Sequence, residues 1–401
     1  IELVACGSSS STMPSFGEWE YRMLDEAYDN IDYVSLHRYY SNPHNDTPDF
    51  LASTMDLDDF IRTVASICDA VKGKKHSKKR VQLSLDEWNV WYHSSEQDAK
   101  LLKASPWGQA LPLLEDIYNF EDALLVGLML ITILKNADRV KIACMAQLVN
   151  VIAPIMTRAG GGAWAQTIFY PLMQCSALGR GVSLLPLLSC DKFDTKHFCD
   201  VPVVDAAAVL GADGSVTVFA VNRDLQEGAE LALDLRSFGE LRMLSHSVLH
   251  HDDMKAVNTE EKPHEVAPVD APVSKPGEPV LLPPFWQVTR RRTGLAFHLQ
   301  SVENSFFGGL IFFLLFSAIR AIITPYREER EQAGECAFRE PAEGESRRCG
   351  PAIHPGAGGE KPPGRAPYRA MEVGLAVGRV NRGGNAVNPS LDQGGFFYCK
   401  N

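Results

Sequence analysis

The residues best suited to chemistry are two adjacent carboxylates at the end of an apolar run. Asp86 and Glu87 directly follow residues 81–85, which are predicted to form a buried β-strand. Three aromatic side chains come within the next five positions: Trp88, Trp91 and Tyr92. A carboxylate beside aromatic rings suits sugar binding, because the apolar face of a sugar ring stacks on them. Side chains alternate along a strand, so we expect only one of the two carboxylates to face a site. The alternative is an acid that caps the next helix beside core tryptophans.

Polar side chains also follow two other predicted strands. His37 and Tyr39 lie at the end of the strand predicted at 31–37, two residues apart and therefore on one side if the strand continues. From there both can hydrogen-bond a carboxylate. Gln147 lies near the end of the strand predicted at 142–149, where its amide can bind sugar hydroxyls.

The surrounding pattern places these groups at one edge of a parallel sheet. Strands predicted at 3–6, 31–37, 81–85 and 142–149 alternate with helices predicted at 13–28, 56–71, 121–135 and 164–175. This alternation is typical of α/β folds, whose functional groups gather at the carboxyl ends of the strands. Beyond about residue 180, apolar runs flank a turn at 211–214 and continue without helices, which predicts an antiparallel all-β sandwich.

Length and charge exclude several classes of protein. The chain has 401 residues, is 45% hydrophobic and carries a net charge of −11, so it is globular and has room for more than one domain. The acidic balance argues against general nucleic-acid binding and against docking on anionic lipid. Nine cysteines, an odd number without a CxxC pair, indicate reduced thiols in a reducing compartment.

The sequence predicts no metal site and no phosphate-binding loop. Residues 250–253 read His-His-Asp-Asp, but they lie at the edge of the predicted sandwich, where we expect a polar turn. Gly160, Gly161 and Gly162 precede a predicted helix, yet no Lys-Ser/Thr pair follows them. We therefore expect no cofactor.

The composition changes near residue 293. Residues 1–293 contain 27 basic and 39 acidic side chains, whereas residues 294–401 contain 12 and 11 and are rich in Gly, Pro and Arg. The tail includes an uncharged apolar stretch at 304–319, which is shorter than the roughly 20 residues of a membrane span. We interpret 294–401 as an unassigned tail that is disordered or does not belong to the protein, and we expect no membrane association. The alternative is a hydrophobic anchor at residues 306–319.

Long motifs in the first 290 residues resemble one enzyme family. The segments SLDEWNVWYH, DYVSLHRYY, MPSFGEWE and GGAWAQTIFYP are similar to the α-L-arabinofuranosidases of glycoside hydrolase family 51, and the resemblance runs from about residue 2 to about 290. It implies a (β/α)8 TIM barrel, of which only the C-terminal half with strands 5–8 is present, followed by an all-β sandwich. We expect the half barrel at 1–180 and the sandwich at 181–293.

The resemblance also assigns roles to single residues. It implies a retaining hydrolase that removes non-reducing terminal α-L-arabinofuranosyl residues, with Glu87 as the nucleophile. By the same analogy Tyr39 orients Glu87, and His37 lies beside the sugar. Trp91 forms an aromatic wall of the sugar pocket, and Gln147 binds a hydroxyl group.

The family's acid/base glutamate ends the fourth barrel strand, whereas the strand predicted at 3–6 aligns with the fifth. We therefore expect the chain by itself to lack this residue and to be inactive or nearly so. The alternatives are an inactive carbohydrate-binding remnant of such an enzyme and a related barrel glycosidase acting on β-glucans or xylans. The expected partners are arabinofuranosyl oligosaccharides or polysaccharides and copies of the same chain, and the expected location is the cytoplasm.

Overall fold

The computed structural model describes residues 1–238, 241–273, 275, 279–282, 286–293 and 372–379. All of these belong to one compact unit. The hydrophobic stretch at 304–319 and most of the tail beyond residue 293 lie outside the described residues. Within the described part, no helix is long and apolar enough to cross a membrane, and its six cysteines are all free.

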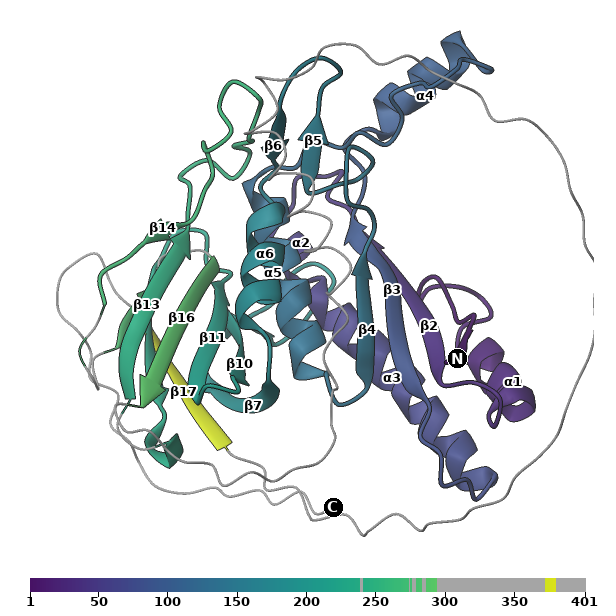
Figure 1. Cartoon of the computed structure of the whole chain (residues 1–401), viewed down its shortest axis with the longest axis horizontal. Coiled ribbons are helices and arrows are strands. Elements are labelled where there is room, and N and C mark those ends of the chain that lie inside the picture. The colour runs from purple at the N-terminus through teal and green to yellow at the C-terminus, as the bar shows by residue number, and fades with distance from the viewer. Residues whose placement is uncertain (239–240, 274, 276–278, 283–285, 294–371, 380–401) are drawn as a thin grey trace, which may run out of the picture. The chain divides into compact units, whose positions relative to one another are not determined.

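The first part of the chain forms a four-stranded parallel sheet, as the alternating pattern predicts (Figure 1). Its strands lie side by side in chain order: β1 (Val4–Ala5), β2 (Tyr33–Tyr40), β3 (Gln82–Val90) and β4 (Val140–Met145). The connections contain the helices α1 (Glu18–Ala27), α2 (Thr47–Ala52), α3 (Thr54–Lys74), α4 (Ser95–Ala104) and α5 (Phe120–Lys135). The carboxyl ends of β2 and β3 therefore meet at one edge of the sheet.

Helix boundaries follow local capping and burial. Helix α1 begins at Glu18, five residues later than predicted, because Gly17 has a positive φ of 83° and Glu20 accepts the backbone N–H of Gly17. Helix α3 buries the apolar stripe that predicts it, and α5 is buried over nearly its whole surface.

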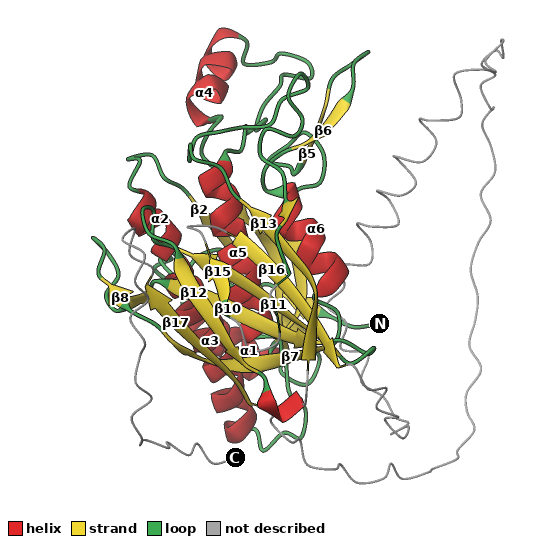
Figure 2. Cartoon of the chain, turned by 90° about the vertical axis from the view of Figure 1, so that its left-hand side faces the viewer, coloured by secondary structure: helices red, strands yellow, loops and turns green. Residues whose placement is uncertain are grey.

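The helix predicted at 164–175 is misplaced. Residues 163–165 instead form strand β6 (Ala163–Ala165), paired with β5 (Ile155–Thr157), and helix α6 starts at Phe169 and ends at Leu178. The glycines at 160–162 belong to the turn of this hairpin, so they do not precede a helix directly. Helix α6 lies beside β13 (Leu241–Leu249), where Gln174 Nε2 donates to Ser247 Oγ at 2.9 Å (Figure 2).

The second part of the chain is a nine-stranded ladder in the described residues. Its order is β14-β13-β16-β11-β10-β7-β17-β12-β15. Besides β13, its members are β7 (Val182–Ser189), β10 (Val204–Leu210), β11 (Ser215–Asn222), β12 (Ala229–Asp234), β14 (Val269–Asp270), β15 (Val280–Leu282), β16 (Trp286–Thr293) and β17 (Glu372–Arg379). All pairs are antiparallel except β17 with β7. A separate two-stranded pair joins β8 (Lys192–Phe193) to β9 (Val201–Pro202). Strands β15 and β16 are close in sequence but join different neighbours in the ladder.

Strands distant in the ladder share one apolar core. Val204 in β10 and Val216 in β11 belong to the same buried cluster as Leu231 in β12 and Val280 in β15. The ladder must therefore bring its two ends face to face around this core, as the layers of a β-sandwich do.

Helix α5 packs against both sheets (Figure 1). Lys135 Nζ at its end pairs with Asp205 Oδ1 in β10 at 2.9 Å. The fully buried Arg223 donates to the carbonyl oxygens of Leu51 in α2 and Pro202 in β9, at 3.1 and 2.8 Å. The parallel sheet and the ladder are thus joined by buried polar contacts as well as by apolar packing.

Candidate active site

A β-bulge in β3 brings both carboxylates to the same side of the sheet. Leu36 of β2 pairs with Leu85 and the next residue, His37, pairs with Glu87, so Asp86 is an extra residue in the strand. A bulge bends the strand and redirects a side chain. The expectation that Asp86 and Glu87 point to opposite sides is wrong, because it assumes an unbroken alternation along β3.

Glu87 is held by Tyr39 and flanked by His37, both from the neighbouring strand. Tyr39 Oη donates to Glu87 Oε2 at 3.1 Å, and His37 Nδ1 lies 3.5 Å from the same oxygen. Burial, then the charge and hydrogen bond of Glu87, raise the pKa of Tyr39, so its hydroxyl stays protonated and donates. No described residue hydrogen-bonds Glu87 Oε1, and the side chain is 48% exposed. One carboxylate oxygen is therefore anchored and the other is open.

Asp86 contacts the other nitrogen of the same histidine. His37 Nε2 lies 3.1 Å from Asp86 Oδ1, and Ser35 Oγ donates to that oxygen at 2.7 Å. Ser84 Oγ donates to Asp86 Oδ2 at 3.2 Å. Asp86 thus accepts two hydrogen bonds, and Ser35 Oγ also lies 3.2 Å from His37 Nε2, so that this serine links the carboxylate to the ring. We call His37, Tyr39, Asp86 and Glu87 the open cluster.

The three aromatic residues after Glu87 have different environments. Trp88 is fully buried, as the core alternative expects, whereas Trp91 is 42% exposed. The Trp91 ring packs edge-on against Tyr39, with 5.6 Å between ring centroids. Of the two tryptophans, Trp91 is thus the one that presents an aromatic surface beside the open cluster.

Gln147 lies just beyond β4 in an exposed loop at the same edge of the sheet. The preceding residue, Ala146, donates its N–H to Trp88 O at 3.3 Å. The buried Asn89 side chain donates to the carbonyl oxygens of Ala146 and Ile152, at 2.8 and 2.7 Å. Strand β3 therefore fixes the Gln147 loop, although no described hydrogen bond joins the Gln147 side chain to the open cluster.

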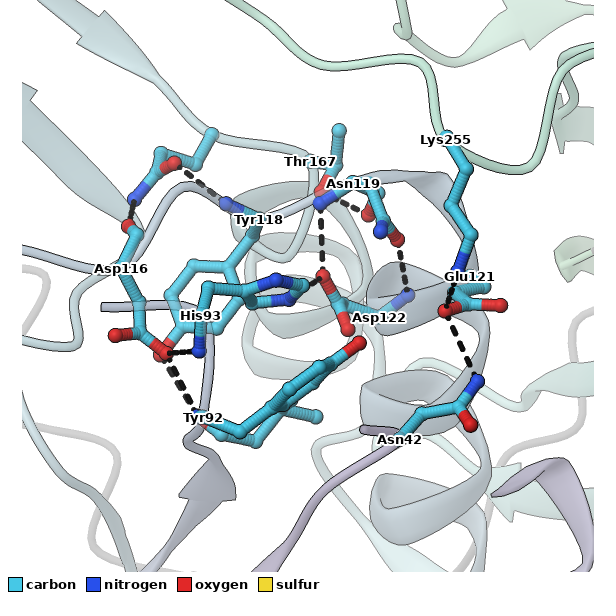
Figure 3. Close-up of polar contacts among 12 residues, drawn as sticks. Asn42, Tyr92, His93, Asp116, Tyr118, Asn119, Glu121, Asp122, Thr167 and Lys255 are labelled. Atoms are coloured by element: carbon cyan, nitrogen blue, oxygen red, sulfur yellow. Dashed lines mark hydrogen bonds and ion pairs between the residues drawn. The ribbon is translucent and has the colours of Figure 1, made fainter. Parts of the chain in front are cut away.

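Sequence reasoning missed a second group of carboxylates around the start of α5 (Figure 3). We call His93, Asp116, Glu121, Asp122 and Lys255 the buried cluster. Asp116 Oδ2 accepts the backbone N–H groups of Tyr92 and His93, and Oδ1 accepts that of Ser94, at 2.9–3.0 Å. The turn that follows β3 is thereby fixed.

Asp122 and Glu121 tie the helix start to three other segments. Asp122 Oδ2 accepts the Asn119 N–H at 2.8 Å and lies 2.8 Å from His93 Nε2, while the Asn119 side chain caps the Asp122 N–H. Glu121 accepts from Asn42 and Thr47 and pairs with Lys255.

The histidine and its carboxylate titrate in a buried setting. Burial lowers the pKa of His93, but the hydrogen bond and charge of Asp122, together with the charges of Asp116 and Glu121, raise it by more, so the net result is a raised pKa. The only sequence signal for the buried cluster is the Asn119-x-x-Asp122 cap and two acids that begin an otherwise apolar helix.

The described residues hold no group of ligands that could bind a metal ion. His250 Nε2 pairs with Asp252 Oδ1 at 3.2 Å, and His251 Nε2 lies 3.8 Å from Glu265, so residues 250–253 form separate contacts at the end of β13. The predicted polar turn fits this geometry.

A parallel sheet that presents carboxylates, a histidine and an exposed tryptophan at the carboxyl ends of its strands is characteristic of an α/β enzyme. Residues 86–284 match a family described as the α-L-arabinofuranosidase C-terminal domain. An intracellular exo-α-(1→5)-L-arabinofuranosidase of Acetivibrio thermocellus is 57% identical over 266 residues, covering 65% of this chain and 53% of that protein. A Bacillus subtilis relative of the same name is 56% identical over 267 residues, with 66% and 53% covered.

A solved structure supports the same relationship. The family 51 α-L-arabinofuranosidase from Bifidobacterium longum superimposes with a TM-score of 0.69 at 37% identity, covering 73% of this chain and 60% of that one. The resemblance predicted from the sequence is confirmed: the chain is related to the family 51 α-L-arabinofuranosidases. It spans about half the length of the curated relatives it matches.

Proposed function

We propose that this protein is a retaining α-L-arabinofuranosidase that removes non-reducing terminal α-L-arabinofuranosyl residues, with Glu87 as its nucleophile. The observation that carries the proposal is the asymmetry of the Glu87 carboxylate. Both of its contacts, with Tyr39 and His37, fall on Oε2, and Oε1 is open toward solvent. A nucleophilic carboxylate needs one oxygen held and the other free to reach the anomeric carbon.

The reaction then proceeds in two displacements. Glu87 Oε1 forms a bond to the anomeric carbon as the bond to the leaving oxygen breaks, and the electron pair goes to that oxygen. Water next forms a bond to the same carbon as the bond from that carbon to Glu87 Oε1 breaks, the electron pair returns to the carboxylate, and the proton of the water passes to the solvent. Tyr39 holds Oε2 throughout, and His37 lies beside the sugar ring.

Binding residues surround this carboxylate at the same edge of the sheet. Trp91 stacks on the apolar face of the sugar, because its exposed ring is held against Tyr39. Gln147 binds a sugar hydroxyl from the loop that Asn89 fixes. The substrate is neutral and requires no strong electric field, so the acidic net charge does not distinguish one carbohydrate substrate from another.

The first displacement needs a proton donor for ordinary substrates. Each oxygen of Asp86 already accepts a hydrogen bond, from Ser35 and from Ser84, and the side chain lies against the His37 ring. We therefore give Asp86 no acid/base role, and the nucleophile is best tested with a leaving group that departs without protonation.

The same proposal covers the architecture and the setting. Residues 1–180 correspond to strands 5–8 of a (β/α)8 barrel and residues 181–293 to the sandwich. The relatives' names describe them as intracellular, and we propose the cytoplasm for this protein too, with assembly into a homo-oligomer.

The deciding experiment uses 2,4-dinitrophenyl α-L-arabinofuranoside, whose leaving group needs no proton. Release of dinitrophenolate is followed by absorbance, and the arabinosyl adduct is located by peptide mass spectrometry. We expect the adduct on Glu87, its loss in Glu87→Gln, and no change in Glu96→Gln, which alters an exposed side chain on α4 by the same chemistry. An adduct on another residue, or an active Glu87→Gln, contradicts the proposal.

Two further results separate the alternatives. Arabinose binding by calorimetry without any adduct would favour the carbohydrate-binding remnant. Faster release from aryl xylosides or glucosides than from the arabinofuranoside would favour the related barrel glycosidase.

A further inference from the structure

The bulge in β3 leaves Asp86 beside the nucleophile with no assigned task. Between the pairs Leu85–Ala143 and Trp88–Met145, β3 has two residues where β4 has one. The register with β2 slips at the same point, so the extra residue disturbs both neighbouring ladders. Bulges of this kind interrupt hydrogen bonding in the ladder, and they are found where a side chain must be redirected.

The redirected side chain ends against His37. Its Oδ1 lies 3.1 Å from His37 Nε2, while the other ring nitrogen lies 3.5 Å from Glu87 Oε2. The imidazole therefore stands between two carboxylates that are adjacent in sequence. Ser35 Oγ lies 3.2 Å from the same ring nitrogen and gives its one hydrogen to Asp86, so it accepts from His37 and the proton lies on Nε2.

Two hydroxyl groups fix Asp86 itself. Ser35 Oγ donates to Oδ1 at 2.7 Å and Ser84 Oγ donates to Oδ2 at 3.2 Å, one from β2 and one from β3. Both serines are buried. Asp86 is thus anchored to the rigid part of the sheet, whereas His37 and Glu87 are the more exposed members of the chain of contacts.

We infer that Asp86 is a positioning residue for Glu87 and acts through His37. With Ser35 it holds the imidazole in one tautomer and one orientation, so that the Nδ1 edge, which carries no hydrogen, borders Oε2 and Tyr39 remains the donor to that oxygen. With Oε2 confined on two sides, Oε1 points to the anomeric carbon. This inference rests on the proposed function of Glu87 and adds the reason for the bulge.

The first test measures the nucleophile's reactivity. The first-order rate of adduct formation on Glu87 and the substrate KM are compared in wild type, Asp86→Ala and Asp86→Asn. Positioning groups around a reactive residue typically contribute about 10–100-fold. We expect Asp86→Ala to lower the rate within that range with KM changed less than about threefold, because Asp86 does not contact the sugar. Asp86→Asn keeps an acceptor oxygen and should recover part of the rate.

The second test needs no substrate. Nitrogen-15 chemical shifts of the His37 ring, assigned with His37→Gln, report which nitrogen carries the proton. We expect a single Nε2–H tautomer in wild type and a mixture in Asp86→Ala. If Asp86→Ala does not fold, Ser35→Ala is measured in its place, because it removes one anchor of the carboxylate. It should show the same changes in the His37 ring, with adduct formation at about one third of the wild-type rate. Asp252→Ala, at an exposed carboxylate near β13, should show none.

The outcomes distinguish this inference from the proposed function. A wild-type protein that forms no adduct on Glu87 overturns the proposed function. Adduct formation in Asp86→Ala within about twofold of wild type, or an unchanged His37 tautomer, overturns the positioning role while leaving the nucleophile assignment intact.

Discussion

The open cluster and the buried cluster contain the same kinds of group and use them differently. Each sets a histidine against carboxylates next to tyrosine rings, one at the end of β2 and β3 and the other at the start of α5 (Figure 3). In the open cluster, Glu87 is 48% exposed and has a free oxygen. In the buried cluster, Asp116, Glu121 and Asp122 are fully buried.

The difference lies in what satisfies the carboxylates. Asp116 accepts three consecutive backbone N–H groups, and Glu121 accepts two side-chain donors and pairs with Lys255. Such groups fix the backbone and have little capacity left to react. Glu87 is held at one oxygen only. Asp122 Oδ1 also has no hydrogen-bond partner among the described residues, but it is buried. Exposure, more than residue type, thus separates the reactive carboxylate from the structural ones.

The largest expected effect is the loss of chemistry in Glu87→Gln. Removing the nucleophile should lower adduct formation on the order of 10³-fold or more. Stability should change by less than about 0.5 kcal/mol, because the side chain is half exposed. Dinitrophenolate release and urea denaturation measure the two quantities. A marked loss of stability would show that Glu87 also stabilises the fold. It would contradict the difference drawn between the open cluster and the buried cluster.

Glu121→Gln should show the opposite profile. The amide leaves Lys255 without its carboxylate and turns donors toward Asn42 and Thr47. Lys255 is 43% exposed, so the cost comes mainly from the mismatched hydrogen bonds at the buried position 121, about 1–3 kcal/mol. It is measured by urea denaturation against Glu96→Gln as the exposed control. A loss below about 1 kcal/mol would mean that the cluster tolerates substitution as the open cluster does.

His93→Gln should destabilise the protein in a pH-dependent manner. The folded-state pKa of His93 is raised, above all by Asp122 against the effect of burial. The stabilisation is therefore complete below the unfolded value near pH 6.5 and is lost as pH rises through the folded value. We expect about 1–2 kcal/mol at pH 5.5, consistent with a charged hydrogen bond, shrinking toward alkaline pH.

The control for that measurement is His44→Gln, which alters an exposed histidine. Its urea midpoint should stay within error of wild type at every pH. A difference between wild type and His93→Gln that grows with pH would contradict the direction of the pKa shift.

The smallest expected effect is that of Asn119→Ala. The Asn119 side chain accepts the Asp122 N–H at 3.1 Å as the cap of α5. Removing a cap costs about 1 kcal/mol, and adduct formation should be unchanged. Asn30→Ala, in an exposed turn, is the matched control. An effect on adduct formation would show that the two clusters are coupled through the turn after β3.

Much of the parallel sheet could be predicted from the sequence, because buried apolar residues recur with the period of the helix or strand that contains them. The apolar stripe of α3 and the continuous apolar run of α5 placed both helices within a few residues. The pairing of His37 and Tyr39 on one side of β2 also follows from alternation, and both reach Glu87.

What alternation could not predict is a change of register. The bulge at Asp86 depends on the ladders that β3 forms with both neighbours, and a single strand's sequence does not contain that information. Sequence reasoning missed the buried cluster for a related reason. Glu121 and Lys255 are far apart in sequence. Only the packing of the 254–258 segment against α5 brings the lysine to the buried carboxylate and offsets its desolvation.

The buried Arg223 has a consequence for how the molecule comes apart. Its guanidinium keeps its hydrogen bonds to Leu51 and Pro202 only while α2, β9 and β11 hold their native places. Pulling the ladder from the parallel sheet would break the buried hydrogen bonds of Arg223 to Leu51 and Thr54, whereas its pair with Asp205 of the same ladder would remain. The unfolding of one sheet is therefore coupled to the unfolding of the other through the contacts of this side chain. We expect a single melting transition. We also expect proteases to cleave the chain near residue 180 no faster than they cleave the cores on either side.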